Sequence, residues 1–115
     1  MKIAAVRYAV DQWQAAKRFY GEVLGLTLLD SDDGTGHATY GTEGGPPLEL
    51  VRQPVSAGTG AGAIVSLACP DVEALRARLA EAGARVDDDL LESRTARRLT
   101  FYDPDGNAIE AVQRL

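Results

Sequence analysis

The order of predicted secondary-structure elements repeats once along the 115-residue chain, and this repeat limits the possible folds more than any other feature. Apolar patterning in the first half predicts a strand, a helix and three strands, at residues 2–10, 13–24, 26–30, 37–41 and 47–53. The same order follows in the second half, at residues 62–69, 72–82, 84–88, 97–103 and 107–113. Cys69 lies 59 positions (69 − 10) after Val10, at the end of the corresponding strand. The chain is therefore predicted to contain two tandem βαβββ modules.

These modules predict an α+β fold in a single domain, because 115 residues are one domain's worth of chain. We expect module one at residues 1–53, a linker of small residues at 54–62, and module two at 63–115. Within module one, Trp13 and Tyr20 fall on the apolar face of the predicted helix and are expected in the core.

Composition excludes several classes of function. The net charge of −5 and the pI near 4.7 argue against nucleic-acid binding, which needs a basic face. No apolar run approaches the roughly 20 residues of a membrane span. A single cysteine, Cys69, provides no disulfide framework, so the predicted location is the cytoplasm. The acidic clusters at residues 30–33 and 87–89 are interpreted as solvated loops, because calcium would need more oxygen ligands than either provides.

Two glutamates occupy matching places in the fourth predicted strand of each module. Glu49 stands between Leu48 and Leu50, and Glu110 stands between Ile109 and Ala111. Since side chains alternate between the faces of a strand, each carboxylate points away from its apolar neighbours. If those neighbours pack on the helices, both glutamates lie on the opposite face of the sheet.

The stretch Asp103-Pro104-Asp105-Gly106-Asn107 comes immediately before the strand that carries Glu110. Proline presets φ for a turn, aspartate and asparagine bond their own backbone, and glycine accepts a positive φ. Apolar residues on both sides predict a β-hairpin at this point. Either Glu110 simply faces water, as a glutamate in an antiparallel strand often does, or the hairpin serves to aim it into a cavity.

Three stretches of the chain resemble the vicinal oxygen chelate superfamily, which includes glyoxalase I, extradiol dioxygenases and bleomycin-binding resistance proteins. They are AAKRFYGEVLGL at residues 15–26, LEL at 48–50 and FYDPDGNAIEAV at 101–112. The resemblance implies that the two modules form an eight-stranded, U-shaped mixed sheet with the helices on the outside, around a cavity for a small molecule. It also implies a homodimer.

Metal-dependent members of this superfamily place a ligand on the first and fourth strands of each module. The fourth-strand positions match Glu49 and Glu110, whereas the first-strand positions, usually histidines, fall on Ala5 and Ile64. Alanine and isoleucine bind no metal, and a divalent centre needs about three protein ligands. The single histidine, His37, is interpreted as an exposed strand-end or loop residue. We therefore predict neither a metal nor a cofactor.

Two carboxylates facing a cavity need compensation by a metal, which the missing histidines disfavour, by protonation, by a fixed cation such as Arg7, or by a cationic ligand. Small and aliphatic side chains beside them are typical of a small-molecule site. The predicted ligand-binding residues lie on the strands around this face: Ala5, Arg7, Glu49, Ile64, Ser66, Tyr102 and Glu110.

Two functions remain open. The first is a metal-free binding protein that sequesters an antibiotic or metabolite. The alternative is an enzyme: a lyase, epimerase or dioxygenase relative that uses Glu49 and Glu110 as weak metal ligands, or as a general base beside Arg7. A domain kept only for dimerisation or for a partner is a third possibility.

Overall fold

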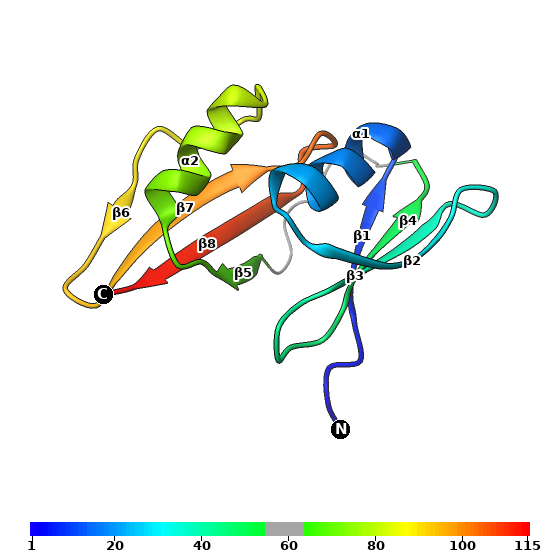
Figure 1. Ribbon diagram of the computed structural model, residues 1–115, viewed down its shortest axis with the longest axis horizontal. Coiled ribbons are helices and arrows are strands. Elements are labelled where there is room, and N and C mark those ends of the chain that lie inside the picture. The colour runs from blue at the N-terminus through cyan, green and yellow to red at the C-terminus, as the bar shows by residue number, and fades with distance from the viewer. Residues whose placement is uncertain (55–63) are drawn as a thin grey trace. The chain divides into compact units, whose positions relative to one another are not determined.

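The computed structural model describes residues 1–54 and 64–115. Residues 1–54 belong to one compact unit, unit 1, and residues 64–115 to a second, unit 2. Unit 1 contains four strands and one α-helix (Figure 1), and a π-helical segment continues directly from the α-helix. In chain order they are β1 (Val6–Val10), α1 (Trp13–Arg18), η1 (Phe19–Val23), β2 (Thr27–Asp32), β3 (His37–Gly41) and β4 (Leu48–Arg52). The strands form one mixed sheet in the order β1-β4-β3-β2, in which β1 and β4 are parallel.

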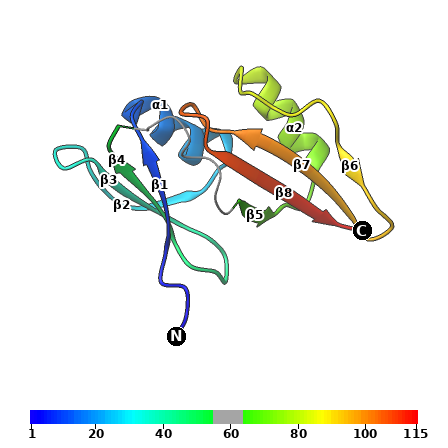
Figure 2. The same ribbon diagram turned by 180° about the vertical axis from the view of Figure 1, so that it is seen from behind.

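Unit 2 repeats this order with one helix and four strands (Figure 2). Its elements are β5 (Val65–Ala68), α2 (Val72–Glu81), β6 (Leu91–Glu92), β7 (Ala96–Tyr102) and β8 (Ala108–Arg114). The sheet order is β5-β8-β7-β6, with β5 and β8 parallel, so the topology matches that of unit 1. The α+β class and the two tandem βαβββ modules are confirmed, whereas the predicted linker at 54–62 lies outside the described residues apart from Pro54.

The core of unit 1 lies between its helical segment and one face of its sheet. Tyr20, at 0% exposure, stacks on Tyr8 of β1 with 6.2 Å between ring centroids, and it lies equally close to Tyr40 of β3. Leu48 and Leu50 of β4 are buried on the same side. Burial of Trp13 and Tyr20 confirms that the apolar helical face enters the core. Gly25 ends the helical segment with a φ of 74°, which an L side chain rarely adopts.

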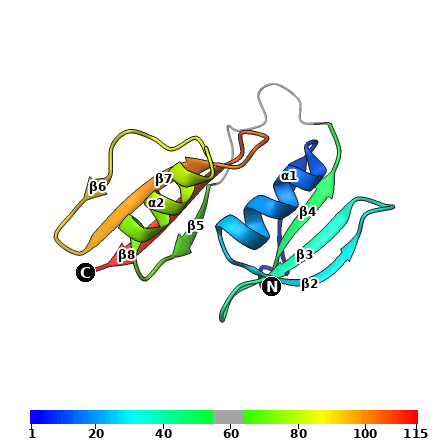
Figure 3. The same ribbon diagram turned by 45° about the horizontal axis from the view of Figure 1, so that its top comes forward.

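In unit 2, α2 packs along β7 and β8 (Figure 3). Leu99 and Phe101 of β7 and Ile109 of β8 are fully buried beneath it. The first turn of α2 is capped from two directions, because Asp71 accepts from the backbone N–H of Ala74 and Gln113 accepts from that of Val72. Gln113 thus ties β8 to the start of the helix that covers it.

The strand predicted at 84–88 is only partly formed. Val86 makes an isolated bridge to Phe101, Tyr102 N–H donates to the carbonyl of Arg85, and Asp87 N–H donates to that of Thr100. The regular ladder resumes in β6, after the three consecutive aspartates, whose side chains favour turns and solvent over a sheet. No helix among the described residues is long and apolar enough to cross a membrane.

The turn between β2 and β3 is built from its own polar groups. Asp32 accepts from the N–H groups of Gly34 and Thr35, at 2.9 and 3.3 Å. Gly36 adopts a φ of 76° and lies against Arg52, where an added Cβ would come within 2.5 Å of the Arg52 Cβ. The turn therefore requires glycine for both its conformation and the close approach of β4.

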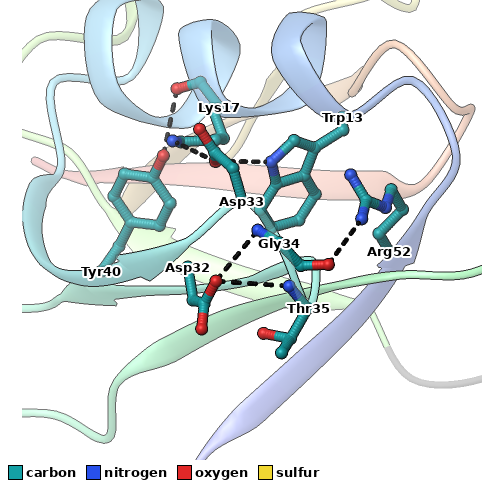
Figure 4. Close-up of polar contacts among 8 residues, drawn as sticks. All are labelled: Trp13, Lys17, Asp32, Asp33, Gly34, Thr35, Tyr40 and Arg52. Atoms are coloured by element: carbon teal, nitrogen blue, oxygen red, sulfur yellow. Dashed lines mark hydrogen bonds and ion pairs between the residues drawn. The ribbon is translucent and has the colours of Figure 1, made fainter.

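The same turn is attached to α1 by Asp33 (Figure 4). Its carboxylate accepts from the Trp13 indole Nε1 and the Lys17 ammonium, both at 2.8 Å. Tyr40 of β3 adds a hydrogen bond to the backbone carbonyl of Lys17. The interpretation of residues 30–33 as a solvated loop was wrong for residues 30–32, which belong to β2. Asp33 does lie in the exposed turn, and it also reaches donors on α1 that the sequence pattern does not reveal. These contacts hold the hairpin against the helix and lower the pKa of Asp33, chiefly through the hydrogen bond from Lys17.

We predict that, in the Asp33→Asn variant, the free energy of unfolding changes less with pH in the acidic range than it does in the wild type. The folded-state pKa lies below the ordinary value of 3.8, so the ionised carboxylate stabilises the fold fully above that value. This contribution disappears as the pH falls through the folded-state pKa. Urea unfolding from pH 7 to pH 2 should show the two proteins converging at low pH. Asp88→Asn, at an exposed loop aspartate, is the control, and a wild-type advantage that stays constant with pH would contradict the prediction.

The hairpin that joins β7 to β8 is organised by Asp103, which is only 4% exposed. One carboxylate oxygen, Oδ1, accepts from the backbone N–H groups of Asp105 and Asn107, and Oδ2 accepts from the Asn107 side chain, all within 2.9 Å. Gly106 completes the turn with a φ of 88°. The buried carboxylate is thus satisfied within the loop, which sets the start of β8 at Ala108, two residues before Glu110.

Asp103→Ala is expected to lower the free energy of unfolding by about 2–3 kcal/mol, because it leaves two inward-facing backbone N–H groups without an acceptor. Asp103→Asn is the matched control and should lose less, since the amide oxygen can still accept from both groups. Urea denaturation measures the difference, and hydrogen exchange at the amides of residues 105 and 107 should accelerate in the alanine variant. Equal unfolding midpoints for the alanine variant and the wild type would refute this role of Asp103.

Candidate functional site

Glu49 lies on the face of the unit 1 sheet opposite its buried neighbours on β4. Its strand partner on β1 is Arg7, whose Nε lies 3.0 Å from Glu49 Oε2. From β3, His37 Nε2 lies 3.7 Å from the same oxygen. The Glu49 side chain is 22% exposed, so it is partly withdrawn from water while Arg7 compensates its charge. The arginine considered as the compensating partner does form this ion pair.

Glu110 has the same placement in unit 2. Its strand partner on β5 is Ser66, whose hydroxyl donates to Glu110 Oε1 at 2.8 Å. Arg98 of β7 donates from Nη1 to the same oxygen at 3.1 Å. The Glu110 side chain is 24% exposed and that of Arg98 is 42% exposed. This carboxylate is therefore held by one neutral and one cationic donor.

The two clusters are built on one plan. In each, a first-strand residue lies directly across from the glutamate, and a third-strand residue reaches it diagonally. The diagonal residues, His37 and Arg98, stand two positions before Thr39 and Thr100, the β3 and β7 partners of the glutamates. Both were missed as site residues, and His37, interpreted as an exposed strand-end residue, is half-buried beside Glu49. The register of each hairpin, combined with the alternation of side chains along a strand, would have identified His37 and Arg98 as neighbours of the glutamates.

Tyr102 is committed to a different contact. Its hydroxyl donates to Asp87 at 3.0 Å, and the guanidinium of Arg85 lies 4.0 Å from its ring centroid. The hydrogen bond to Asp87 raises the pKa of Tyr102, which keeps the phenol protonated as a donor. Its strand partner is Ala108, two residues before Glu110. The structure therefore places Tyr102 beside the 85–87 segment rather than in the Glu110 cluster.

Ala5 and Ile64 each lie immediately before the first strand of their unit, as β1 begins at Val6 and β5 at Val65. Ile64 is 54% exposed, and neither side chain carries a donor atom for a metal. Within residues 1–54 and 64–115, no three His, Cys, Asp or Glu side chains are grouped so that they could hold a metal ion. Because each glutamate already faces a guanidinium, this donor set does not fit a divalent centre.

The charges of the two clusters determine which ligands they favour. Arg7 offsets Glu49 and Arg98 offsets Glu110, so neither carboxylate needs a cationic ligand for compensation. In each unit the donors converge on a single carboxylate oxygen. The other oxygen, Oε1 of Glu49 and Oε2 of Glu110, receives no hydrogen bond from the part of the chain that the structure describes. Each cluster therefore combines an acceptor oxygen with a neighbouring arginine.

Similar solved structures match essentially the whole chain. TnmS3, an antibiotic binding protein from Streptomyces sp. CB03234, is 28% identical with a TM-score of 0.75, over 100% of this chain and 97% of that one. A glyoxylase/bleomycin resistance protein/dioxygenase domain from Frankia sp. EAN1pec is 25% identical with a TM-score of 0.77, over 100% and 98%. Lactoylglutathione lyase from Agrobacterium tumefaciens, at 19% identity and a TM-score of 0.70 over 96% and 92%, shares the fold.

No curated protein sequence matches this chain. The family model described as Glyoxalase/Bleomycin resistance protein/Dioxygenase superfamily matches residues 2–111, which include most of both modules and all residues of both glutamate clusters. The chain therefore belongs to the glyoxalase/bleomycin resistance protein/dioxygenase superfamily.

Proposed function

We propose that this protein binds a small molecule without a metal ion and sequesters it, the ligand being an antibiotic or a metabolite. The observation that carries the proposal is the pairing of each fourth-strand glutamate with an arginine, Glu49 with Arg7 and Glu110 with Arg98. A carboxylate engaged by a guanidinium is a poor ligand for a divalent cation, because the two cations compete for one charge. Ala5 and Ile64 supply no imidazole to restore a coordination set.

The likeness to TnmS3 supports the same proposal, since that protein is an antibiotic binding protein and its likeness extends over the whole chain.

The homodimer expected from the superfamily resemblance is part of the proposal, as is the cytoplasmic location expected from the single cysteine. Light scattering on the purified protein tests the first, and cell fractionation tests the second.

An enzymatic function is the second candidate, and the open oxygen of Glu110 favours it. A general base needs an unengaged oxygen within reach of a substrate proton, and Arg98 stands close enough to stabilise a developing anion. Glu110→Gln would abolish turnover in this case. Under the binding proposal the same change alters affinity only, and the ligand is recovered chemically intact from the wild-type protein.

We predict that thermal unfolding of chelator-stripped protein is unchanged by Ni²⁺, Zn²⁺, Mn²⁺ or Fe²⁺. A panel of antibiotics that contains uncharged, aromatic and cationic compounds, bleomycin among them, should include a compound that raises the midpoint. A ligand at 100 times its Kd stabilises the folded state by about 2.7 kcal/mol when it binds only that state. Mass spectrometry of the bound compound should show its mass unchanged.

Glu92→Gln is the control for this experiment, because Glu92 pairs with Arg97 away from both clusters. A midpoint that rises with a metal in the wild type and in Glu92→Gln, but not in Glu110→Gln, would overturn the metal-free proposal. Chemical conversion of a bound compound would instead establish the enzymatic alternative.

A further inference from the structure

The cluster in unit 2 presents a donor and an acceptor side by side. Ser66 and Arg98 both donate to Oε1 of Glu110, which leaves Oε2 without a hydrogen bond among the described residues. Arg98 uses Nη1 for this contact, and its Nη2 likewise has no acceptor in the described part of the chain. An arginine side chain can only donate hydrogen bonds, and an ionised carboxylate can only accept them.

Both side chains are held in place as well as partly accessible. Exposed fractions of 42% for Arg98 and 24% for Glu110 leave their outer edges open on this face of the sheet. The other face is closed, since Leu99, Ile109 and Ala111 are buried there beneath α2. The corresponding Arg7 in unit 1 is 61% exposed, so water competes more strongly there for any ligand group.

Resting on the proposed binding function, we propose that Arg98 and Glu110 form a subsite for an uncharged, amide-like group of the ligand. A ligand carbonyl accepts from Arg98, and a neighbouring ligand N–H donates to Oε2 of Glu110. The pair selects against charged groups of either sign. A carboxylate placed on Arg98 is repelled by Glu110, and a cation placed on Glu110 is repelled by Arg98.

Three fragments of nearly the same shape test this subsite. Benzamide offers a carbonyl acceptor beside an NH2 donor group, benzoate offers only acceptors, and protonated benzamidine offers only donors. We predict that benzamide binds the wild-type protein with a Kd about threefold to tenfold below those of the other two, as one additional hydrogen bond provides. The measurement is a chemical-shift titration that follows the side-chain signals of Arg98 and Glu110.

Glu110→Gln should invert this order. The glutamine carbonyl must face Arg98, which can only donate, so the amide NH2 takes the open position of Oε2. Both open groups are then donors, and benzoate should become the best fragment. Glu92→Gln is the matched control. Glu92 pairs with Arg97, which precedes Arg98 on β7 and therefore points to the opposite face of the sheet. This control should leave the order of the three fragments unchanged.

The subsite is overturned if benzoate or benzamidine binds best to the wild type, or if the order is the same in a folded Glu110→Gln variant. It is also overturned if none of the three fragments produces a saturable shift at Arg98 and Glu110. When that last result accompanies intact antibiotic binding, the proposed function stands and the subsite alone fails. Benzamide binding and the inverted order, found in a protein that binds no antibiotic or metabolite, would support the subsite and count against the proposed function alone.

Discussion

The side-chain alternation of β4 and β8 is the constraint on which both clusters depend. In each strand, two buried apolar residues fix the register by packing on the helix side, and the glutamate between them must then face the other way. A partly buried carboxylate is unfavourable unless a cation or donors meet it. Neighbouring strands of the same sheet supply these groups, so compensation is achieved within each unit.

The two units solve this problem with different residues. Arg7 lies directly opposite Glu49, whereas the corresponding Ser66 is neutral, and the guanidinium comes from Arg98 on the other flank. Both units thus reach one arginine per glutamate through different strands. Because the arginine comes from the first strand in unit 1 and from the third strand in unit 2, the charge of each cluster is balanced but the donors point in different directions. The two faces are consequently unequal as binding surfaces, although the backbone plan is repeated.

Turns next to the strands hold the sheet faces that carry the two glutamate clusters. Asp103 closes the turn before β8 with hydrogen bonds inside the loop, and so fixes where β8 begins and to which face Glu110 points. In unit 1, Asp33 fastens the β2–β3 turn to α1 through Trp13 and Lys17. His37 begins β3 directly after that turn, so the same contacts place it beside Glu49. Residues remote from the clusters therefore decide which side chains reach the glutamates.

The sequence by itself determined the βαβββ repeat, the apolar helix faces and the turn before β8. It also determined that both glutamates lie on the sheet face opposite the helices. These features follow from short-range periodicity and turn chemistry, which act within a few residues of chain. Only the tertiary structure revealed that His37 and Arg98 reach the glutamates, that Tyr102 is bound to Asp87, and that Asp33 holds a hairpin to a helix. Each of these contacts joins residues more than ten positions apart, and depends on strand register and on the packing of one element against another, which sequence spacing does not encode.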